Sequence, residues 1–98
     1  MSIKQHNPIH PGPFIKKVYL EPFKITNAEL ALKLGVDTST VSRMLRGHTD
    51  IIPLMALKLS KVIGRSPESW LLMQDNFNLH QVEQTVDLSD CEQIQFAL

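Results

Sequence analysis

One short stretch of the chain combines small hydroxyl side chains with a single guanidinium group. In "DTSTVSRML", residues 37–45, Thr38, Ser39 and Ser42 lie close in sequence to Arg43. On a helix these side chains share the outer face, and an α-helix is slender enough to enter the major groove of DNA. Hydroxyl groups hydrogen-bond to base edges, and arginine can bind O6 and N7 of guanine together. The pattern indicates a DNA-recognition helix.

The same residues also have a plainer interpretation. Thr and Ser near the start of a helix often serve as caps, and we expect Asp37 or Thr38 to cap this one. Arg43 can instead pair on the surface with the carboxylate of Asp37 or Glu29. The DNA-reading interpretation requires that Thr38, Ser39 and Arg43 are not covered by the rest of the chain.

Two predicted helices and the turn between them position this face. The helices span residues 27–34 and 38–46, and a connecting turn of about three to four residues is the proportion of a helix-turn-helix. Thr26 can accept a hydrogen bond from the N–H of Glu29 while Glu29 reaches back to the N–H of Thr26, which is a capping box. Gly35 supplies the positive φ that ends the first helix.

The corner between these helices requires one small and one stiff side chain. Helices that cross steeply come close together, so Ala31 fits where a larger residue would hold them apart. We expect Val41 to point back into the core, where its restricted χ1 fills the space above Ala31. The result is a tight corner with the hydroxyl-rich face on the outside.

The rest of the chain predicts three further helices and no strands. The first begins at Pro11 and stops before Pro22, because proline is tolerated in a first turn and breaks a helix interior. Pro53 opens a fourth helix that Gly64 closes, and Ser66 caps a fifth in "SPESWLLMQ". No window shows two alternating strands joined by a hairpin turn. The fold class is therefore all-α, with five short helices.

The chain divides into an arm, a domain and a tail. We expect an N-terminal arm at residues 1–10, a helix-turn-helix domain at 11–79 and an acidic tail at 80–98. The end of the tail alternates apolar residues as a strand would, yet Ser89 and Glu92 can form the capping box of a helix. The fold of the tail stays open between helix, strand and disorder.

The net charge is zero, but the two signs are separated along the chain. Residues 1–73 hold all ten Lys and Arg and five of the ten acidic residues, whereas residues 74–98 hold five acidic residues and no basic one. This asymmetry suggests a body that binds an anion and a tail that binds a cation or folds onto the body. Solvated surface charge is the alternative for the tail.

Composition disfavours several classes of function. No apolar stretch approaches a membrane span, and the start "MSIKQHNPIHPG" lacks the apolar core of a signal peptide. The single cysteine, Cys91, excludes an internal disulfide and fits a reducing cytoplasm. The four histidines form no metal-binding spacing with Cys91, and no phosphate loop or nucleophile elbow is present. We expect a cytoplasmic protein without enzymatic activity, metal or cofactor.

Three long segments and one short one resemble a known family in order and spacing. "HPGPFIKKVYLEP", "NAELALKLGVDTSTVSRMLRGHTDI", "ALKLSKVIGRSPESWLLMQ" and "NFNL" are similar to the HigA-type antitoxins, or plasmid-maintenance antidotes, of the XRE/Cro–repressor group. The resemblance covers residues 8–79 and implies a five-helix XRE/lambda-repressor-like helix-turn-helix domain. Ile52 departs from it, because the family usually has a Thr cap before the fourth helix.

The resemblance implies roles for individual residues. In this group the start of the second helix contacts phosphate and the first turns of the third contact bases. The base-contacting set is then Thr38, Ser39, Ser42 and Arg43. The phosphate-contacting set is Asn27, Thr40, Arg46, His48 and Thr49, with Lys4 of the arm as an addition.

The resemblance also implies partners. It predicts a homodimeric bacterial repressor that binds a palindromic operator, neutralises a small toxin, usually a RelE-like endoribonuclease, and represses its own operon. The predicted dimer interface is Leu71, Leu72 and Phe77, with Trp70 in the core. The tail can dock on a basic toxin, pack on the dimer mate or stay disordered. An XRE-type repressor without a toxin, or a module that mainly binds proteins, is the alternative function.

Overall fold

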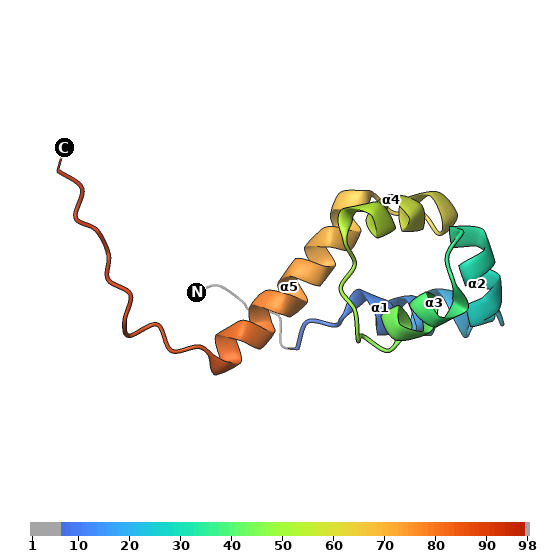
Figure 1. Cartoon of the computed structure of the whole chain (residues 1–98), viewed down its shortest axis with the longest axis horizontal. Helices are drawn as coiled ribbons and strands as arrows, with labels where there is room; N and C mark the ends of the chain where they lie inside the picture. The colour runs from blue at the N-terminus through green and yellow to red at the C-terminus, as the bar shows by residue number, and fades with distance from the viewer. Residues whose placement is uncertain (1–6, 98) are drawn as a thin grey trace.

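The computed structural model describes residues 7–97 and is built from five α-helices (Figure 1). No strand occurs within these residues, so the predicted all-α fold is confirmed. In the same part of the chain, no helix is apolar over enough of its length to cross a membrane. The helices are α1 (Pro11–Ile15), which η1 (Lys16–Leu20) continues, α2 (Asn27–Leu34), α3 (Thr38–Leu45), α4 (Pro53–Val62) and α5 (Pro67–Thr85).

The start of α1 lies against the end of α3. His10 is the N-cap residue of α1, and its Nδ1 accepts a hydrogen bond from the backbone N–H of Gly12 at 2.8 Å. Pro11 occupies the first helical position, where its missing N–H leaves no bond unmade. A Cβ added to Gly12 would overlap the backbone carbonyl oxygen of Met44. The two backbones therefore touch at a point where only glycine fits.

The predicted first helix has one irregularity. Over η1 it widens into a π-helix, in which the N–H of Glu21 bonds to the carbonyl of Lys16 at 2.9 Å. The apolar spacing of Phe14, Ile15 and Val18 suits both helix types, so the sequence carried no signal for the wider turn. The helical segment ends before Pro22, as predicted.

The capping of α2 follows the prediction. Thr26 Oγ1 accepts from the N–H of Glu29 at 3.1 Å, and Glu29 Oε1 accepts from the N–H of Thr26 at 3.1 Å. Gly35 ends the helix with φ of 70°. Ala31 and Val41 are both buried at the corner with α3.

The predicted capping of α3 is wrong. Asp37 occupies its N-cap position, but no side-chain hydrogen bond caps the helix. Asp37, Thr38 and Ser39 are all exposed, so water can satisfy the first N–H groups of this helix in place of a side chain. The first turn of α3 is therefore not closed by its own side chains.

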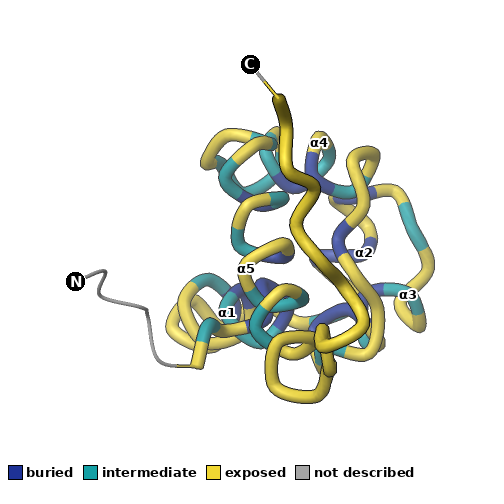
Figure 2. Tube along the Cα trace, turned by 90° about the vertical axis from the view of Figure 1, so that its left-hand side faces the viewer, coloured by how far each residue is buried: buried dark blue, intermediate teal, exposed yellow. Residues whose placement is uncertain are grey.

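Trp70 lies at the centre of the core, as predicted, and is fully buried. Its Nε1 donates a hydrogen bond to the carbonyl of Gly64 at 2.9 Å, which pairs its one polar atom. Figure 2 shows the buried residues lining the space between the helices. The buried hydrophobic residues are Ile15, Leu20, Leu30, Ala31, Leu34, Val41, Met44, Leu45, Ile51, Ala56, Leu59 and Trp70.

The last helix is longer than the sequence indicated. Ser66 caps α5 by accepting from the N–H of Ser69 at 3.0 Å, and the helix continues to Thr85. The segment that we predicted as a tail from residue 80 thus begins inside α5. Residues 86–97 form neither helix nor strand and are exposed throughout.

The capping box predicted within the tail does not form. The N–H of Ser89 bonds to Asp87 Oδ1 at 2.9 Å instead, and the chain runs on without a helix as far as residue 97. Because residues 86–97 lie in solvent, no packed face selects one regular structure for them.

Candidate nucleic-acid interface

The face of α3 that points away from the core carries the predicted base-contacting residues. Thr38, Ser39 and Arg43 are exposed, and Ser42 is half-buried. Positions four apart lie one turn apart on the same side of a helix, so 38 with 42 and 39 with 43 form one continuous surface. The opposite side packs into the core through Val41, Met44 and Leu45.

The guanidinium of Arg43 has no carboxylate partner among residues 7–97. Glu29, one of its two predicted surface partners, turns its carboxylate back onto Thr26 in the capping box. Asp37, the other, makes no bond to it. The structure therefore contains neither of the predicted surface ion pairs of Arg43. Its guanidinium is available to a ligand.

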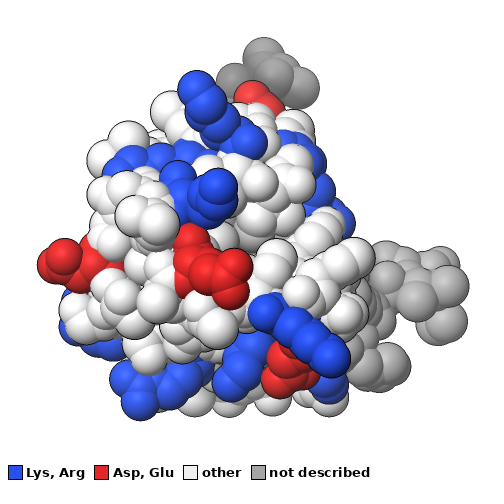
Figure 3. Space-filling view, turned by 90° about the vertical axis from the view of Figure 1, so that its right-hand side faces the viewer, with Lys and Arg blue, Asp and Glu red and all other residues white. Residues whose placement is uncertain are grey.

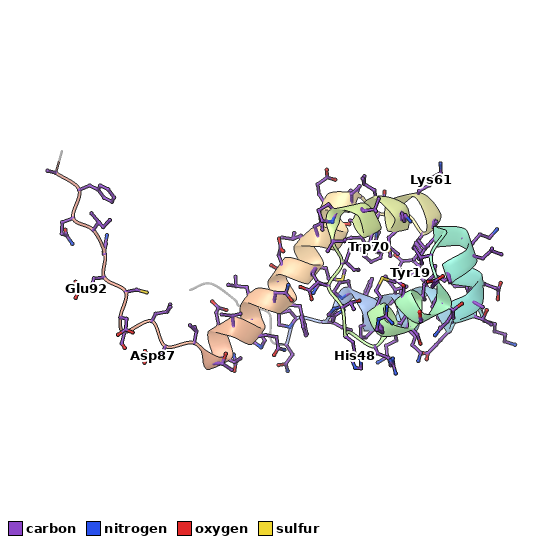
Figure 4. All side chains as sticks on the ribbon, viewed as in Figure 1. Tyr19, His48, Lys61, Trp70, Asp87 and Glu92 are labelled. Carbon is purple, nitrogen blue, oxygen red and sulfur yellow. The ribbon has the colours of Figure 1, made fainter. Side chains whose placement is uncertain are left out.

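The predicted phosphate-contacting residues lie on three elements. Arg46, His48 and Thr49 are exposed in the 46–52 loop that joins α3 to α4, and Figure 4 shows His48 pointing away from the body. Thr40 is half-buried on α3, and Asn27 is half-buried as the first residue of α2. The predicted contribution of Lys4 lies outside the described residues.

A cavity of about 220 Å³ brings some of these residues together. It lies between α3, the 46–52 loop and α4, and its walls include Thr40, Arg43 and Thr49. Lys58 of α4 lines the same cavity, although the sequence analysis did not select it. Its ammonium group can bind a phosphate oxygen beside Thr40 and Thr49, although the carboxylate of Asp50 lines the cavity too.

The 46–52 loop is held in place by a polar cluster on α5. The side chain of Gln74 is 2% exposed, and its Oε1 accepts from the backbone N–H of Ile51 at 2.8 Å. Gln74 Nε2 donates to Asp50 Oδ1 at 3.3 Å and to Asn78 Oδ1 at 3.1 Å. Asn78 Nδ2 donates to Asp50 Oδ2 at 2.9 Å. The cluster ties both the backbone and a side chain of the loop to one helix.

The sequence analysis missed this cluster because the loop and helix members that it joins are 23 or more residues apart in the chain. One signal was present: Gln74 and Asn78 are four apart, so they lie on the same side of a helix. Nothing in the sequence indicated that this side faces a loop.

Gln74→Leu is expected to lower the free energy of unfolding by about 1–3 kcal/mol, because it leaves the buried N–H of Ile51 without a partner. Urea denaturation measures this loss. Gln81→Leu, on the exposed part of the same helix, is the control. A surface substitution of this kind should change stability by no more than about 0.5 kcal/mol. Equal stability of the two variants would show that the cluster does not hold the loop.

The buried imidazole of His10 lies beneath the same loop. A Cβ on Gly47 would contact its ring at 3.5 Å, and the ring of Phe77 meets it edge-on with centroids 5.1 Å apart. Because Nδ1 accepts from Gly12, the proton of the neutral ring is on Nε2, which is buried and forms no hydrogen bond within residues 7–97. Burial lowers the pKa of His10, and the Thr49 carbonyl and the Asp50 carboxylate oppose this only in part.

The lowered pKa of His10 makes the fold sensitive to acid. The unfolded chain binds a proton at this residue with a pKa near 6.5, and the folded chain binds it only at lower pH. The contribution to stability is therefore complete above pH 6.5 and is lost as the pH falls toward the folded-state pKa. Urea denaturation should give a smaller free energy of unfolding at pH 5 than at pH 7. In His10→Asn, which keeps a capping acceptor but does not titrate, the difference should be smaller.

The surface charge is uneven. On the end of the molecule shown in Figure 3, Lys and Arg side chains outnumber Asp and Glu. Acidic residues gather instead on the later part of α5 and on the 86–97 segment, where Figure 4 shows Asp87 just beyond the end of α5 and Glu92 further out. The basic residues among 7–97 thus lie on the helical body and not on the 86–97 segment. Within the described part of the chain, no three His, Cys, Asp or Glu side chains could hold a metal ion together.

The three predicted dimer-interface residues have different surroundings. Leu72 is 60% exposed, whereas Leu71 is partly buried and packs against the core. Phe77 is partly buried and contacts His10. Of the three, only Leu72 is therefore mostly exposed.

The family model for helix-turn-helix domains, HTH_3, matches residues 15–70. The Escherichia coli K12 HTH-type transcriptional regulator YddM is 39% identical over 87 residues, which are 89% of this chain and 92% of that one. The solved structure of antitoxin GraA superposes with a TM-score of 0.77 at 38% identity and covers 82% of this chain and 86% of its own.

A solved structure that contains DNA is also similar. It holds the Pseudomonas aeruginosa antitoxin HigA with the higBA promoter and superposes with a TM-score of 0.70 at 30% identity. The superposition covers 82% of this chain and 96% of that one. The match of the family model over more than half of the chain and the likeness to two antitoxins show that the chain belongs to the HTH_3 helix-turn-helix family, within the HigA-type group of XRE regulators.

Proposed function

We propose that this DNA-binding regulator binds a palindromic operator as a homodimer, represses its own operon and neutralises a small RelE-like endoribonuclease toxin. The observation that carries the DNA-binding part is the exposed face of Thr38, Ser39 and Arg43, whose guanidinium has no carboxylate partner in residues 7–97. Arg46, His48 and Thr49 lie on the loop directly after this helix, where backbone phosphates pass in helix-turn-helix complexes.

Salt dependence tests DNA binding directly. Each phosphate contact should steepen the slope of log K against log salt by about 0.9. We expect a steep slope for a duplex from the region upstream of the gene, and weaker binding to a scrambled duplex of the same length. Binding that is weak and insensitive to salt would favour the alternative of a module that mainly binds proteins.

A homodimer is supported by a stripe of exposed aliphatic residues on α5. Leu72, Leu79 and Val82 lie on α5, and Val86 is the C-cap residue directly after it, seven residues beyond Leu79. All four side chains are exposed, and the spacing of Leu72, Leu79 and Val82 sets these three along one side of the helix. We name Leu72, Leu79, Val82 and Val86 the α5 stripe. We therefore propose a dimer surface further along α5 than the predicted Leu71, Leu72 and Phe77.

Leu79→Glu is expected to raise the dimer Kd at least about tenfold. Each dimer contains two copies of Leu79, and each substitution removes apolar burial worth about 1 kcal/mol. Sedimentation equilibrium measures the change. Leu57→Glu on α4 is a matched control, because Leu57 is also 59% exposed but lies off the stripe. A dimer that both variants leave unaltered would remove the stripe from the interface.

The toxin partner distinguishes an antitoxin from an ordinary repressor. We expect an adjacent gene to encode a small basic protein that co-purifies with this chain. The chain should also suppress ribosome-dependent mRNA cleavage by that protein. If operator binding is intact and neither effect is found, the protein is an XRE-type repressor without a toxin.

A further inference from the structure

The 86–97 segment leaves large apolar side chains in solvent. Leu88, Ile94 and Phe96 are 62%, 67% and 79% exposed. Figure 2 shows the whole segment exposed, and Figure 1 shows it leaving the end of α5 and extending away from the other helices. A folded domain rarely exposes apolar side chains together without a partner surface. Carboxylates lie between them, at Asp90 and Glu92.

A groove beside the first half of α5 offers the complementary chemistry. It has a volume of about 360 Å³, and Ile9, Phe14, Leu72 and Met73 supply apolar walls. Arg65 also lines the groove, and its guanidinium lies 5.4 Å from the centroid of the Phe14 ring. Within residues 7–97 this guanidinium has no carboxylate partner. The groove therefore fits an extended peptide that carries both apolar and acidic side chains.

We propose that this groove, the α5 groove, binds the 86–97 segment of a second copy of the chain. The proposal rests on the homodimer proposed above, in which the α5 stripes of two copies meet. If the two α5 helices pair antiparallel with Leu79 facing Leu79, Val86 of one copy faces Leu72 of the other. Leu72 lines the α5 groove, so the segment of the second copy enters the groove where its helix ends.

The dimensions agree with this arrangement. From Leu72 back to the start of α5 at Pro67 the helix rises about 8 Å, at roughly 1.5 Å per residue. Two to three extended residues span about the same distance. Leu88 then lies over the apolar part of the groove, and Asp90 reaches the neighbourhood of Arg65. The carboxylate of Asp90 then lies near the guanidinium of Arg65.

A stable dimer also needs more buried surface than the α5 stripe provides. A stable interface takes about 800 Å² from each partner. The four partly exposed aliphatic residues of the α5 stripe supply only part of this area. The exposed apolar side chains of the 86–97 segment add further area when they are buried in the α5 groove.

Two other placements fit less well. To reach the α5 groove of its own copy, the segment would have to reverse direction directly after Val86. A larger cavity of about 600 Å³ between η1, α2 and the end of α4 has two lysines, Lys33 and Lys61. It does not adjoin the α5 stripe, and a carboxylate, Glu29, also lines it.

A spin label on Cys91 tests the proposal, because this exposed residue is the only cysteine of the chain. Full-length chains that are spin-labelled but not isotope-enriched are mixed with ¹⁵N-labelled, spin-free chains. We expect the label to broaden the amide signals of Ile9, Ser69 and Leu72 in the ¹⁵N chain. Absence of broadening, or broadening confined to Lys33 and Lys61, would overturn the assignment.

The oligomeric state separates this inference from the proposed function. Sedimentation of the same labelled sample shows whether a dimer is present. A dimer without broadening at the α5 groove overturns the placement of the segment alone. A monomer overturns both the placement of the segment and the proposed homodimer. DNA binding is tested separately, by the salt dependence of operator affinity.

Charge variants provide a second measurement on the dimer. Arg65→Gln should raise the dimer Kd several-fold, because it removes the cation that the segment meets. Lys61→Gln, which removes a cation from the other cavity, should leave the dimer Kd unchanged. The reverse result would move the segment to that cavity and overturn the proposal.

Discussion

Arg43→Ala is expected to weaken operator binding by about 1–3 kcal/mol for each half-site and to relax the preference for one base pair in each. Arginine is the side chain of α3 that can bind guanine O6 and N7 with two hydrogen bonds, and in this structure its guanidinium is exposed. Since a dimer carries two copies, the affinity of the whole operator should fall by about 30-fold or more. Anisotropy titrations with operator variants at one salt concentration measure both effects.

Arg46→Ala is the matched control for this prediction. Arg46 follows the recognition helix in the 46–52 loop and is expected to contact only the phosphate backbone. Its removal should weaken binding to all sequences alike and flatten the salt slope by about one in each half-site, because one cation no longer meets a phosphate. If both variants lose affinity evenly across operator variants, Arg43 does not read a base.

Gly12→Ala is expected to lower the free energy of unfolding by more than about 3 kcal/mol, at the upper end of overpacking effects. The added methyl group would overlap the carbonyl oxygen of Met44, which belongs to the backbone of the recognition helix and cannot rotate away as a side chain can. A small domain has only about 5–15 kcal/mol of stability, so this loss is a large share of it. Urea denaturation followed by circular dichroism measures the change.

Gly35→Ala provides the comparison for Gly12→Ala. Gly35 has φ of 70°, but a Cβ there would have no heavy atom within 4 Å. Gly35→Ala should therefore lower the free energy of unfolding only by the backbone cost of a left-handed alanine, about 1–2 kcal/mol. If Gly12→Ala proves no more destabilising than Gly35→Ala, the close approach of α1 to α3 is not rigid.

Local signals in the sequence were sufficient for most helix boundaries. The capping box of Thr26 and Glu29, the left-handed Gly35 and the first-turn Pro53 each act within a few residues, so their effect can be read without the fold. The prediction failed at the N-cap of α3, where the side chain of Asp37 forms no capping hydrogen bond. It also ended α5 too early: no proline or glycine follows residue 79, so no local signal marks the true end at Thr85.

The composition of the candidate site was also readable in the sequence. Hydroxyl groups beside Arg43 at helical spacing indicated a DNA-facing helix, and the structure places Thr38, Ser39 and Arg43 in solvent. Lys58 was missed, because only the packing of α4 against the 46–52 loop brings it to the same cavity.

The sequence by itself determined the all-α class, the helix-turn-helix and the face of α3 that is free to meet DNA. These depend on caps, turns and periodicity, which are interactions between residues close in the chain. Tertiary structure alone decided that Gln74 anchors Ile51 and that Gly12 touches Met44. Those contacts join residues 23 or more apart, and such pairs are selected by packing of the whole domain rather than by any local preference.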